Sequence, residues 1–306
     1  MDKIYDIIIL GGGPAGYTAA LYTARAGLET LVIEKMSAGG QMTLTDTIDN
    51  YPGFPDGVDG FTLGMQMQQG AEKYGAVTVY DEITAVDFND KTKKIHTSSG
   101  SYNAKAVIIA TGANPRELGL AEESALIGKG VHYCAHCDGR FYKDKTIVVA
   151  GGGNSAAADA LYLSRIAKKV YIVHRRDTLR ATKIYHTPLT QAENIEFVWN
   201  SNITKIISDG KVTGIEITDK ISGETSRYDC NAVFVSIGRK PATEFLKNIL
   251  PLDKNGYIIA DESTKTDIDG VFAAGDVRTK TLRQIVTAVS DGATAAHFAE
   301  EYISTI

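Results

Sequence analysis

The chain has 306 residues, a length that predicts about two domains, and its hydrophobic content of 43% is ordinary for a soluble globular protein. Its net charge of −5 argues against a nucleic-acid-binding protein, and no apolar run approaches the roughly 20 residues that a membrane span needs. Three cysteines are too few for a secreted disulfide framework, so we expect a cytoplasmic protein.

The first stretch of the chain carries a dinucleotide-binding fingerprint. Residues 4–10 are almost all apolar, which predicts a strand buried on both faces and not a signal peptide. A G-x-G-x-x-G sequence at 11–16, a predicted helix over 17–26 and a second strand over 30–33 follow, ending at Glu34. The glycines allow a pyrophosphate to approach the helix N-terminus, and Glu34 can accept hydrogen bonds from a ribose diol.

A long connection over 36–60 follows this fingerprint. It is rich in glycine, proline and polar residues, which predicts a loop. Loops of this length inside compact domains are usually functional, although a surface insertion is the alternative. The chain continues with a predicted helix over 61–75, short strands over 76–109 and another buried strand over 107–112.

The same plan recurs in the second half of the chain. Its predicted elements are a strand, a GxGxxA loop, a helix and a second strand, at 146–150, 151–156, 157–167 and 169–173. The two glycine loops, which begin at 11 and 151, are farther apart than the two Gly-x-x-Pro turns at 112–115 and 238–241, by about 14 residues. The first copy therefore has about 14 extra residues, and the loop at 36–60 can contain them. The sequence therefore predicts an α/β protein with a duplicated nucleotide-binding domain.

The second copy differs from the first where its second strand ends. In place of an acid it has His174, Arg175 and Arg176, with Arg180 four residues further on. Arginines suit the 2′-phosphate of NADPH, because they form bidentate charge-assisted hydrogen bonds. A solvated basic surface is the alternative. The first copy, with its acid, suits an unphosphorylated adenosine ribose.

Between the two glycine loops lies a C-x-x-C-D sequence. Cys134 and Cys137 can close a small, reducible disulfide, and Asp138 is placed to handle protons. A redox pair between two nucleotide sites indicates an electron relay. The alternative is zinc bound by the cysteines with His132 and His136, but four ligands within six residues cannot easily surround one ion.

The C-terminal part is expected to return to the first domain. Residues 270–277 predict a buried strand that ends in Gly-Asp, and residues 282–285 lead into an Ala-rich helix that reaches 303. An acid at this position can bind a ribityl hydroxyl, and the helix N-terminus can support negative charge on a reduced flavin. Cys230 has no partner in the sequence and is expected to be a packed or incidental thiol.

Taken together, these motifs resemble those of the low-molecular-weight thioredoxin reductases across essentially the whole chain. They are GGGPAG at 11–16, GGQ at 39–41, NYPG at 50–53, ATGA at 110–113, CxxCD at 134–138, GGGNSA at 151–156, HRRDTLRA at 174–181, GVFAAGDV at 270–277 and RQI at 283–285. The resemblance implies FAD, NADPH, a homodimer and a thioredoxin-like substrate, with no metal. It also implies that Cys134 attacks the substrate disulfide, that Cys137 faces the flavin and that Asp138 protonates the departing thiolate.

The resemblance implies two Rossmann-like, doubly wound, three-layer domains, the second inserted into the first. The FAD-binding domain would comprise 1–115 and 242–306, and the NADPH-binding domain, with the redox pair, 116–241. The residues expected to bind FAD are Gly11, Gly13, Pro14, Ala15, Gly16, Glu34, Lys35, Gly40, Gln41, Asn50, Thr111, Gly112, Gly275, Asp276, Arg283, Gln284 and Ile285. Those expected to bind NADPH are Gly153, Asn154, Ser155, Ala156, His174, Arg175, Arg176, Arg180, Ile237 and Gly238.

The chain departs from the pattern of these reductases in two places. Ala135 and His136 stand between the cysteines where Ala-Thr is usual, and Ala158 and Asp159 stand where Glu-Glu is common. Two other functions keep the glycine loops: a flavoprotein that serves one dedicated partner, and a redox-sensing nucleotide-binding protein. Turnover with NADPH and thioredoxin distinguishes the enzyme from the sensor.

Overall fold

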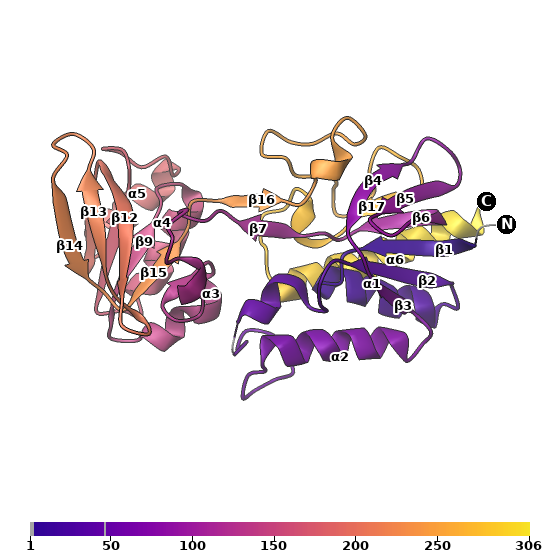
Figure 1. Cartoon of the computed structure of the whole chain (residues 1–306), viewed down its shortest axis with the longest axis horizontal. Helices are drawn as coiled ribbons and strands as arrows, with labels where there is room; N and C mark the ends of the chain where they lie inside the picture. The colour runs from indigo at the N-terminus through magenta and orange to yellow at the C-terminus, as the bar shows by residue number, and fades with distance from the viewer. Residues whose placement is uncertain (1–2, 46) are drawn as a thin grey trace. The chain divides into compact units, whose positions relative to one another are not determined.

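The structure is a computed structural model that describes residues 3–45 and 47–306 (Figure 1). The chain divides into two compact units. Unit 1 comprises the segment that ends at Asn114 together with Lys240–Ile306, and unit 2 comprises Pro115–Arg239. The first segment of unit 1 ends one residue before the expected boundary at 115, and its second segment begins two residues before the expected boundary at 242. The expected α/β fold, with a second Rossmann-like domain inserted into the first, is confirmed.

Unit 1 is built on a mixed sheet with helices against it. Among the described residues, its strands are β1 (Ile4–Leu10), β2 (Thr30–Glu34), β3 (Val77–Tyr80), β4 (Ile83–Asp87), β5 (Lys93–Thr97), β6 (Ser101–Ile109) and β17 (Val271–Ala273). Its α-helices there are α1 (Pro14–Arg25), α2 (Gly60–Glu72) and α6 (Ile285–Ser304). The strand order is β3-β2-β1-β6-β5-β4, with β17 also paired to β6.

The side chains of strand β1 are buried on both faces of the unit 1 sheet. Ile7 and Ile9 belong to the core under the helices, whereas Ile8 and Leu10 belong to the core on the opposite face. Figure 1 shows α1, α2 and α6 together beside the sheet. Helices α1 and α6 approach so closely that a Cβ on Gly292 would lie only 2.2 Å from the carbonyl oxygen of Ala15, so only glycine fits there. The predicted apolar run at 4–10 is therefore a central strand.

Unit 2, which the structure describes in full, has a parallel sheet and a separate antiparallel sheet. Its strands are β8 (Val131–His132), β9 (Thr146–Ala150), β10 (Lys169–Val173), β11 (Ile195–Val198), β12 (Ser201–Ser208), β13 (Val212–Asp219), β14 (Thr225–Asp229) and β15 (Ala232–Val235). Its α-helices are α3 (Ala135–Asp138), α4 (Asn154–Ser164) and α5 (His186–Gln191). The parallel order is β11-β10-β9-β15-β8.

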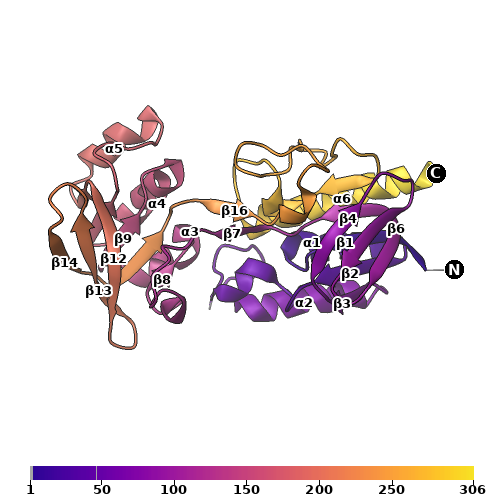
Figure 2. The same cartoon turned by 45° about the horizontal axis from the view of Figure 1, so that its top comes forward.

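The layers of unit 2 follow from which side chains each sheet buries. Alternate residues of β9 and β10 pack against α4 and α5 on one face and against the β12-β13-β14 sheet on the other. Figure 2 shows part of this order, with β13 and β14 on one side of β9 and α4 on the other. The third layer is thus a second sheet rather than a second set of helices.

The remaining elements are short. Strands β7 (Ala113–Pro115) and β16 (Arg239–Pro241) pair with each other where the chain passes between the units. Short 3-10 helices lie at Gly40–Leu44, Ser124–Leu126, Gly139–Tyr142, Lys183–Tyr185, Glu244–Leu246 and Gly275–Val277. The loop expected at 36–60 is present, apart from residue 46, which lies outside the described residues. Within the described part of the chain, no helix is long and apolar enough to cross a membrane.

Candidate active site

The first glycine loop leaves the N-terminus of α1 open to an anion. Gly13 is the N-cap of α1, and no side chain caps the first turn. A Cβ on Gly16 would lie 1.9 Å from the carbonyl oxygen of Gly11, so a larger residue does not fit there. Uncapped N–H groups and the helix dipole favour a phosphate at such a helix end. The loop therefore fits the pyrophosphate of a dinucleotide.

Glu34, at the end of β2, is tied to the same loop. Its Oε2 accepts a 2.6 Å hydrogen bond from the N–H of Gly12, and its Oε1 accepts from the N–H groups of Lys35 and Met36. These bonds fix the carboxylate beside the glycine loop, where its remaining lone pairs can accept from a ribose diol. The side chain of Lys35 is engaged elsewhere, in a 2.6 Å ion pair with Glu82.

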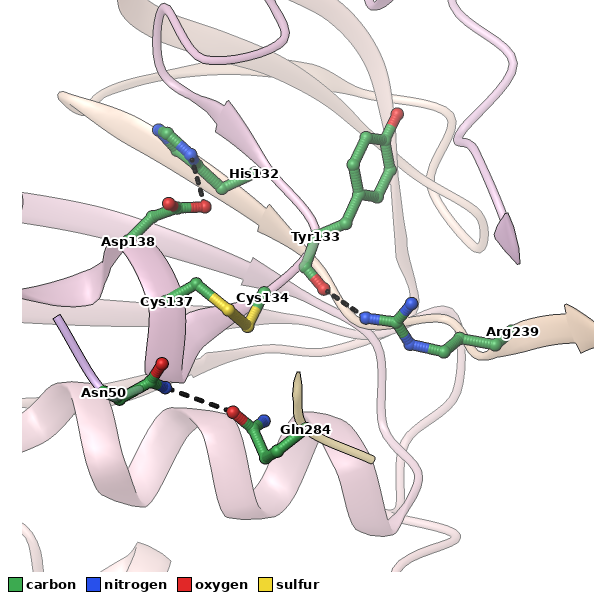
Figure 3. Close-up of a disulfide and its surroundings, with 8 residues drawn as sticks. All are labelled: Asn50, His132, Tyr133, Cys134, Cys137, Asp138, Arg239 and Gln284. Atoms are coloured by element: carbon green, nitrogen blue, oxygen red, sulfur yellow. Dashed lines mark hydrogen bonds and ion pairs between the residues drawn. A yellow bond between two sulfur atoms is a disulfide. The ribbon is translucent and has the colours of Figure 1, made fainter. Parts of the chain in front are cut away.

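The loop at 36–60 contacts several of the other predicted FAD residues. The N–H of Gly39 donates to the first glycine loop at Gly12, at 2.8 Å. Further along, Gln41 Nε2 donates to Asn114 Oδ1 at 2.8 Å. Figure 3 shows Asn50 Nδ2 donating to Gln284 Oε1, at 3.1 Å. The loop is therefore built into the nucleotide edge of unit 1 and is not a detached surface insertion.

The C-terminal strand brings a second group of predicted residues to this edge. A Cβ on Gly275 would lie 2.9 Å from the Cβ of Ala15, so the turn after β17 packs against α1. Asp276 lies in that turn, and the guanidinium of Arg283 donates to the carbonyl oxygen of Arg278 at 3.2 Å. The other predicted residues at this edge are Thr111 and Gly112 after β6, and Gln284 and Ile285 at the start of α6.

A buried ionic network holds the turn that carries Asp276. Asp291 of α6 accepts hydrogen bonds of 2.8 Å from the N–H of Gly275, from Nε and Nη2 of Arg278, and from Nζ of Lys280. Arg278 is only 2% exposed. Burial by itself raises the pKa of Asp291, but the bonds from Arg278 and Lys280 hold that pKa below its ordinary value. The network thus fixes the turn through a carboxylate that stays ionised.

The second glycine loop repeats the geometry of the first. Gly153 is the N-cap of α4, again with no side-chain cap. Gly151 has a φ of 143°, and a Cβ there would lie 2.5 Å from the carbonyl oxygen of Ser236. Asn154 Oδ1 accepts a 2.8 Å hydrogen bond from the N–H of Thr182. With Ser155 and Ala156 in the first turn of α4, this loop also fits a phosphate.

The predicted arginines lie beside this second loop. The N–H of Arg180 donates to the carbonyl oxygen of Gly152 at 2.7 Å, and the buried ring of His174 packs directly beneath Gly152. Burial lowers the pKa of His174, and the positive charges of Arg180, Arg175 and Arg176 lower it further. Their side chains are exposed, and within unit 2 none forms an ion pair with a carboxylate.

The last predicted residues of unit 2 lie next to the crossing strands. Ile237 and Gly238 follow β15 and are exposed, and the carbonyl oxygen of Gly238 accepts from the N–H of Arg116 at 2.9 Å. Arg239 Nη2 donates to the carbonyl oxygen of Tyr133 at 3.4 Å, as Figure 3 shows. The strand that leads to the redox pair is thereby joined to the second crossing of the chain.

Cys134 and Cys137 are joined by a disulfide, with sulfur atoms 2.05 Å apart and Cα atoms 5.3 Å apart (Figure 3). Cys134 is the N-cap of the single-turn helix α3, and Cys137 lies within it. One helical turn brings residues three apart onto the same side, which is what the bond needs. Zinc would require both thiolates, and the disulfide takes them, so the structure favours the redox interpretation.

Asp138 ends a buried chain of hydrogen bonds. Its Oδ2 lies 3.0 Å from Nδ1 of His132, and Nε2 of His132 lies 2.8 Å from the hydroxyl of Tyr142. The His132 ring also stacks on Phe234, with centroids 5.3 Å apart. Burial, and then the charge of Asp138, raise the pKa of Tyr142 to about 12, so its hydroxyl keeps its proton. The carboxyl that follows the redox pair is therefore held in a defined position.

His136, between the two cysteines, lies against α4. Its ring centroid is 4.1 Å from that of Tyr162. Asp159, almost one turn earlier on α4, accepts a 2.6 Å hydrogen bond from the hydroxyl of Ser236. Burial raises the pKa of Asp159, and the hydrogen bond from Ser236 and the charges of His136 and Arg239 partly oppose that rise. The two positions that depart from the reductase pattern thus interact with each other.

Cys230 is a free thiol, as expected, and it is buried at 3% exposure. Burial, and then the charge of Asp229, raise the pKa of this thiol to about 12. A thiolate is the reactive form of cysteine, so this side chain is a packing residue and not a second redox centre.

The sequence did not identify four residues that build the site. His132 was considered only as a zinc ligand, and Tyr142, Arg278 and Asp291 were not singled out. An acid within an Ala-rich helix is a signal that could have identified Asp291, because ionised groups are rarely buried unless they are paired. No comparable signal marks Tyr142, whose contact with His132 depends on the tertiary fold.

Comparison with known proteins gives matches that span this site. Residues 5–292 match the family described as pyridine nucleotide-disulphide oxidoreductase. The chain is 47% identical to a thioredoxin reductase of Listeria monocytogenes, over 100% of this chain and 96% of the relative. It is 44% identical to a thioredoxin reductase of Treponema pallidum, over 100% and 99% of the two chains.

Solved structures agree with these sequence matches. The thioredoxin reductase of Streptococcus pyogenes superposes with a TM-score of 0.93 at 41% identity and covers both chains completely. That of Giardia duodenalis superposes with a TM-score of 0.92 at 36% identity, over 99% of this chain and 100% of the other. The chain therefore belongs to the pyridine nucleotide-disulphide oxidoreductase family and, within it, to the thioredoxin reductases.

Proposed function

We propose that the protein reduces the disulfide of thioredoxin or a thioredoxin-like protein, with electrons taken from NADPH through FAD and the Cys134–Cys137 pair. The observation that carries this proposal is the bonded pair with Asp138 at its end, in the same unit as a glycine loop flanked by three exposed arginines. The relatives in Listeria monocytogenes and Streptococcus pyogenes bear the name thioredoxin reductase, which supports the substrate class.

The residues of unit 1 are suited to hold FAD. The open N-terminus of α1 would receive the pyrophosphate, and Glu34 would accept from the adenosine ribose. In unit 2, the open N-terminus of α4 would receive the pyrophosphate of NADPH, and Arg175, Arg176 and Arg180 would bind its 2′-phosphate. When bound, the two cofactors supply the hydride and thus the two electrons that open the disulfide.

The cysteines of the opened pair would carry out the exchange. The thiolate of Cys134 attacks one sulfur of the substrate disulfide, that S–S bond breaks, and the departing sulfur takes a proton from Asp138. Cys137 then attacks Cys134 in the mixed disulfide, which restores the bond between the two cysteines and releases the substrate dithiol. Two electrons pass from the pair to the substrate, together with one proton from Asp138 and one from Cys137, so the exchange is balanced.

A homodimer and a cytoplasmic location are further parts of the proposal and are based on the resemblance to this family. Light scattering of the purified protein would measure the oligomeric state. Cell fractionation would measure the location. A monomer at micromolar concentration would remove the dimer from the proposal and leave the chemistry of the pair untouched.

The test of the proposed function is an anaerobic titration followed by turnover. We expect a flavin spectrum, reduction by NADPH more readily than by NADH, and formation of thioredoxin dithiol. A Cys137→Ser variant should still accept electrons from NADPH at the flavin and should form no thioredoxin dithiol. Dithiol formation by that variant at the wild-type rate would show that electrons reach the substrate without the pair.

A further inference from the structure

Asp138 needs a source of protons. It is the residue that would protonate the departing thiolate, and it is only 8% exposed. Once it has given up its proton, it must recover another before the next turnover. Direct access of bulk water to so buried a carboxyl is restricted, so the contacts of Asp138 decide how the proton returns.

The contacts of Asp138 form a continuous chain that ends nearer to solvent. Asp138 Oδ2 and His132 Nδ1 are 3.0 Å apart, and His132 Nε2 and the Tyr142 hydroxyl are 2.8 Å apart. Both distances are those of true hydrogen bonds. Tyr142 is only half-buried, in contrast to the buried Asp138 and His132. Figure 3 shows the inner of the two contacts.

The side chains around His132 fix which groups can exchange protons with it. Asp138 faces it from α3, and Tyr142 faces it from the 3-10 helix Gly139–Tyr142. Phe234 of β15 stacks on the ring and carries no charge, and the edge of Tyr142 also packs against Phe234. The ring is thus held in one plane with one nitrogen toward each titratable neighbour.

We propose that His132 and Tyr142 form a proton relay that reloads Asp138 from solvent in every turnover. This inference rests on the acid function proposed for Asp138. The starting tautomer follows from the partners: a carboxylate only accepts, so Nδ1 of His132 carries the hydrogen and Nε2 accepts from the Tyr142 hydroxyl. His132 is a positioning residue in this scheme, since it acts through Asp138.

The transfer is balanced in protons and involves no change of oxidation state. Asp138 takes the proton from Nδ1 of His132, Nε2 takes the proton of the Tyr142 hydroxyl, and Tyr142 takes one from water. The net change is one proton moved from solvent to Asp138. The transfer leaves the ring with its hydrogen on Nε2, and a turn of the ring that exchanges its two nitrogens restores the starting tautomer before the next turnover. Because the Tyr142 hydroxyl keeps its proton at neutral pH, a phenolate does not accumulate.

Three substitutions separate proton relay from mere positioning. His132→Asn keeps an N–H near the place of Nδ1 and so still donates to Asp138, but an amide cannot pass a proton on. His132→Ala leaves a space that added imidazole can occupy. Tyr142→Phe removes one oxygen and keeps the ring contacts. Tyr171→Phe is the matched control, because Tyr171 lies on β10 and packs against Tyr228, away from Asp138.

The measurement is thioredoxin turnover of the flavin-loaded protein, with unfolding midpoints as a check on the fold. We expect His132→Asn, His132→Ala and Tyr142→Phe each to lower kcat about tenfold. Asp138→Asn removes the acid itself and should lower kcat more, by roughly 10²-fold. Imidazole should restore His132→Ala but not His132→Asn. Tyr171→Phe should match the wild type.

Each other outcome overturns the relay. A folded His132→Asn or Tyr142→Phe variant with the wild-type rate would show that Asp138 regains its proton by another route. Failure of imidazole to raise the rate of folded His132→Ala would show that the ring only positions Asp138. A wild-type protein without thioredoxin turnover, or Asp138→Asn with full turnover, would overturn the proposed chemistry and the relay together.

Discussion

The choice of electron donor depends on the arginines beside the second glycine loop. Arg175 and Arg176 are exposed and form no ion pair within unit 2, so substitution by alanine breaks no internal contact of their guanidinium groups. A charge-assisted hydrogen bond contributes about 1.5–3 kcal/mol, and about 1.4 kcal/mol corresponds to a tenfold change in affinity. Because both side chains are solvated, we take the lower end of this range for each.

We therefore expect each single substitution to raise the KM for NADPH about tenfold, and the double substitution up to about a hundredfold. The KM for NADH, which lacks the 2′-phosphate, should change little. The assay is steady-state turnover with either donor, supported by calorimetric titration of the oxidised protein. Arg165→Ala, an exposed arginine at the other end of α4, is the control and should behave as the wild type.

His174 gives a readout of the same arginines that needs no cofactor. Burial and the charges of Arg180, Arg175 and Arg176 together lower the pKa of His174. Removal of two charges should raise that pKa in an NMR titration, while burial keeps it below its ordinary value. Equal losses for NADPH and NADH, or an unchanged His174 titration, would refute the placement of the 2′-phosphate at these arginines.

Two other predictions concern buried charge and the redox pair. Asp291→Asn leaves Arg278 and Lys280 without their carboxylate and should lower the free energy of unfolding by about 3–5 kcal/mol, as measured in urea. Because the pKa of Asp291 is lowered in the folded protein, its carboxylate contributes its full stabilisation of the fold above a pH of about 4. That contribution is lost as the pH falls through the folded pKa. An Asp291→Asn variant whose stability falls with pH as the wild type's does would contradict this prediction. His136→Thr removes the imidazole that lies between Cys134 and Cys137 in the chain and should lower the disulfide potential by about 30 mV for each 1.4 kcal/mol lost. An unchanged potential against a glutathione buffer counts against this prediction.

The sequence predicted strands β1, β2, β9 and β10 well, because each is a short, mostly apolar run that flanks a glycine loop and its helix, whereas no strand was predicted at 131–132 or within 195–229. Strand β9 was predicted at its observed residues. Both α1 and α4 begin three residues earlier than predicted, at Pro14 and Asn154, because the last glycine of each loop is the N-cap of the helix. Strand β17 is shorter than predicted, since Gly275 has a φ of 79° and turns the chain into a 3-10 helix.

The hydrogen-bond partners within the site could not be predicted in the same way. A spacing of three residues is enough to foresee the Cys134–Cys137 bond, and the resemblance supplied Asp138. The contact between Asp138 and His132 joins a helix to a strand, and neither residue type specifies the other. The pairing of Arg278 with Asp291 likewise depends on how α6 packs under the turn after β17. Periodicity predicts elements, whereas such contacts follow only from the packed fold.

The most direct test of the proposed function is the ratio of NADPH oxidised to thioredoxin dithiol formed, measured without oxygen for the flavin-loaded wild type and for Cys137→Ser. We expect about one NADPH oxidised for each thioredoxin disulfide reduced by the wild type, because the Cys134–Cys137 pair carries two electrons. The variant should form no thioredoxin dithiol. NADPH oxidation by the wild type without matching dithiol, or a variant as active as the wild type, would contradict the claim that electrons pass through this disulfide.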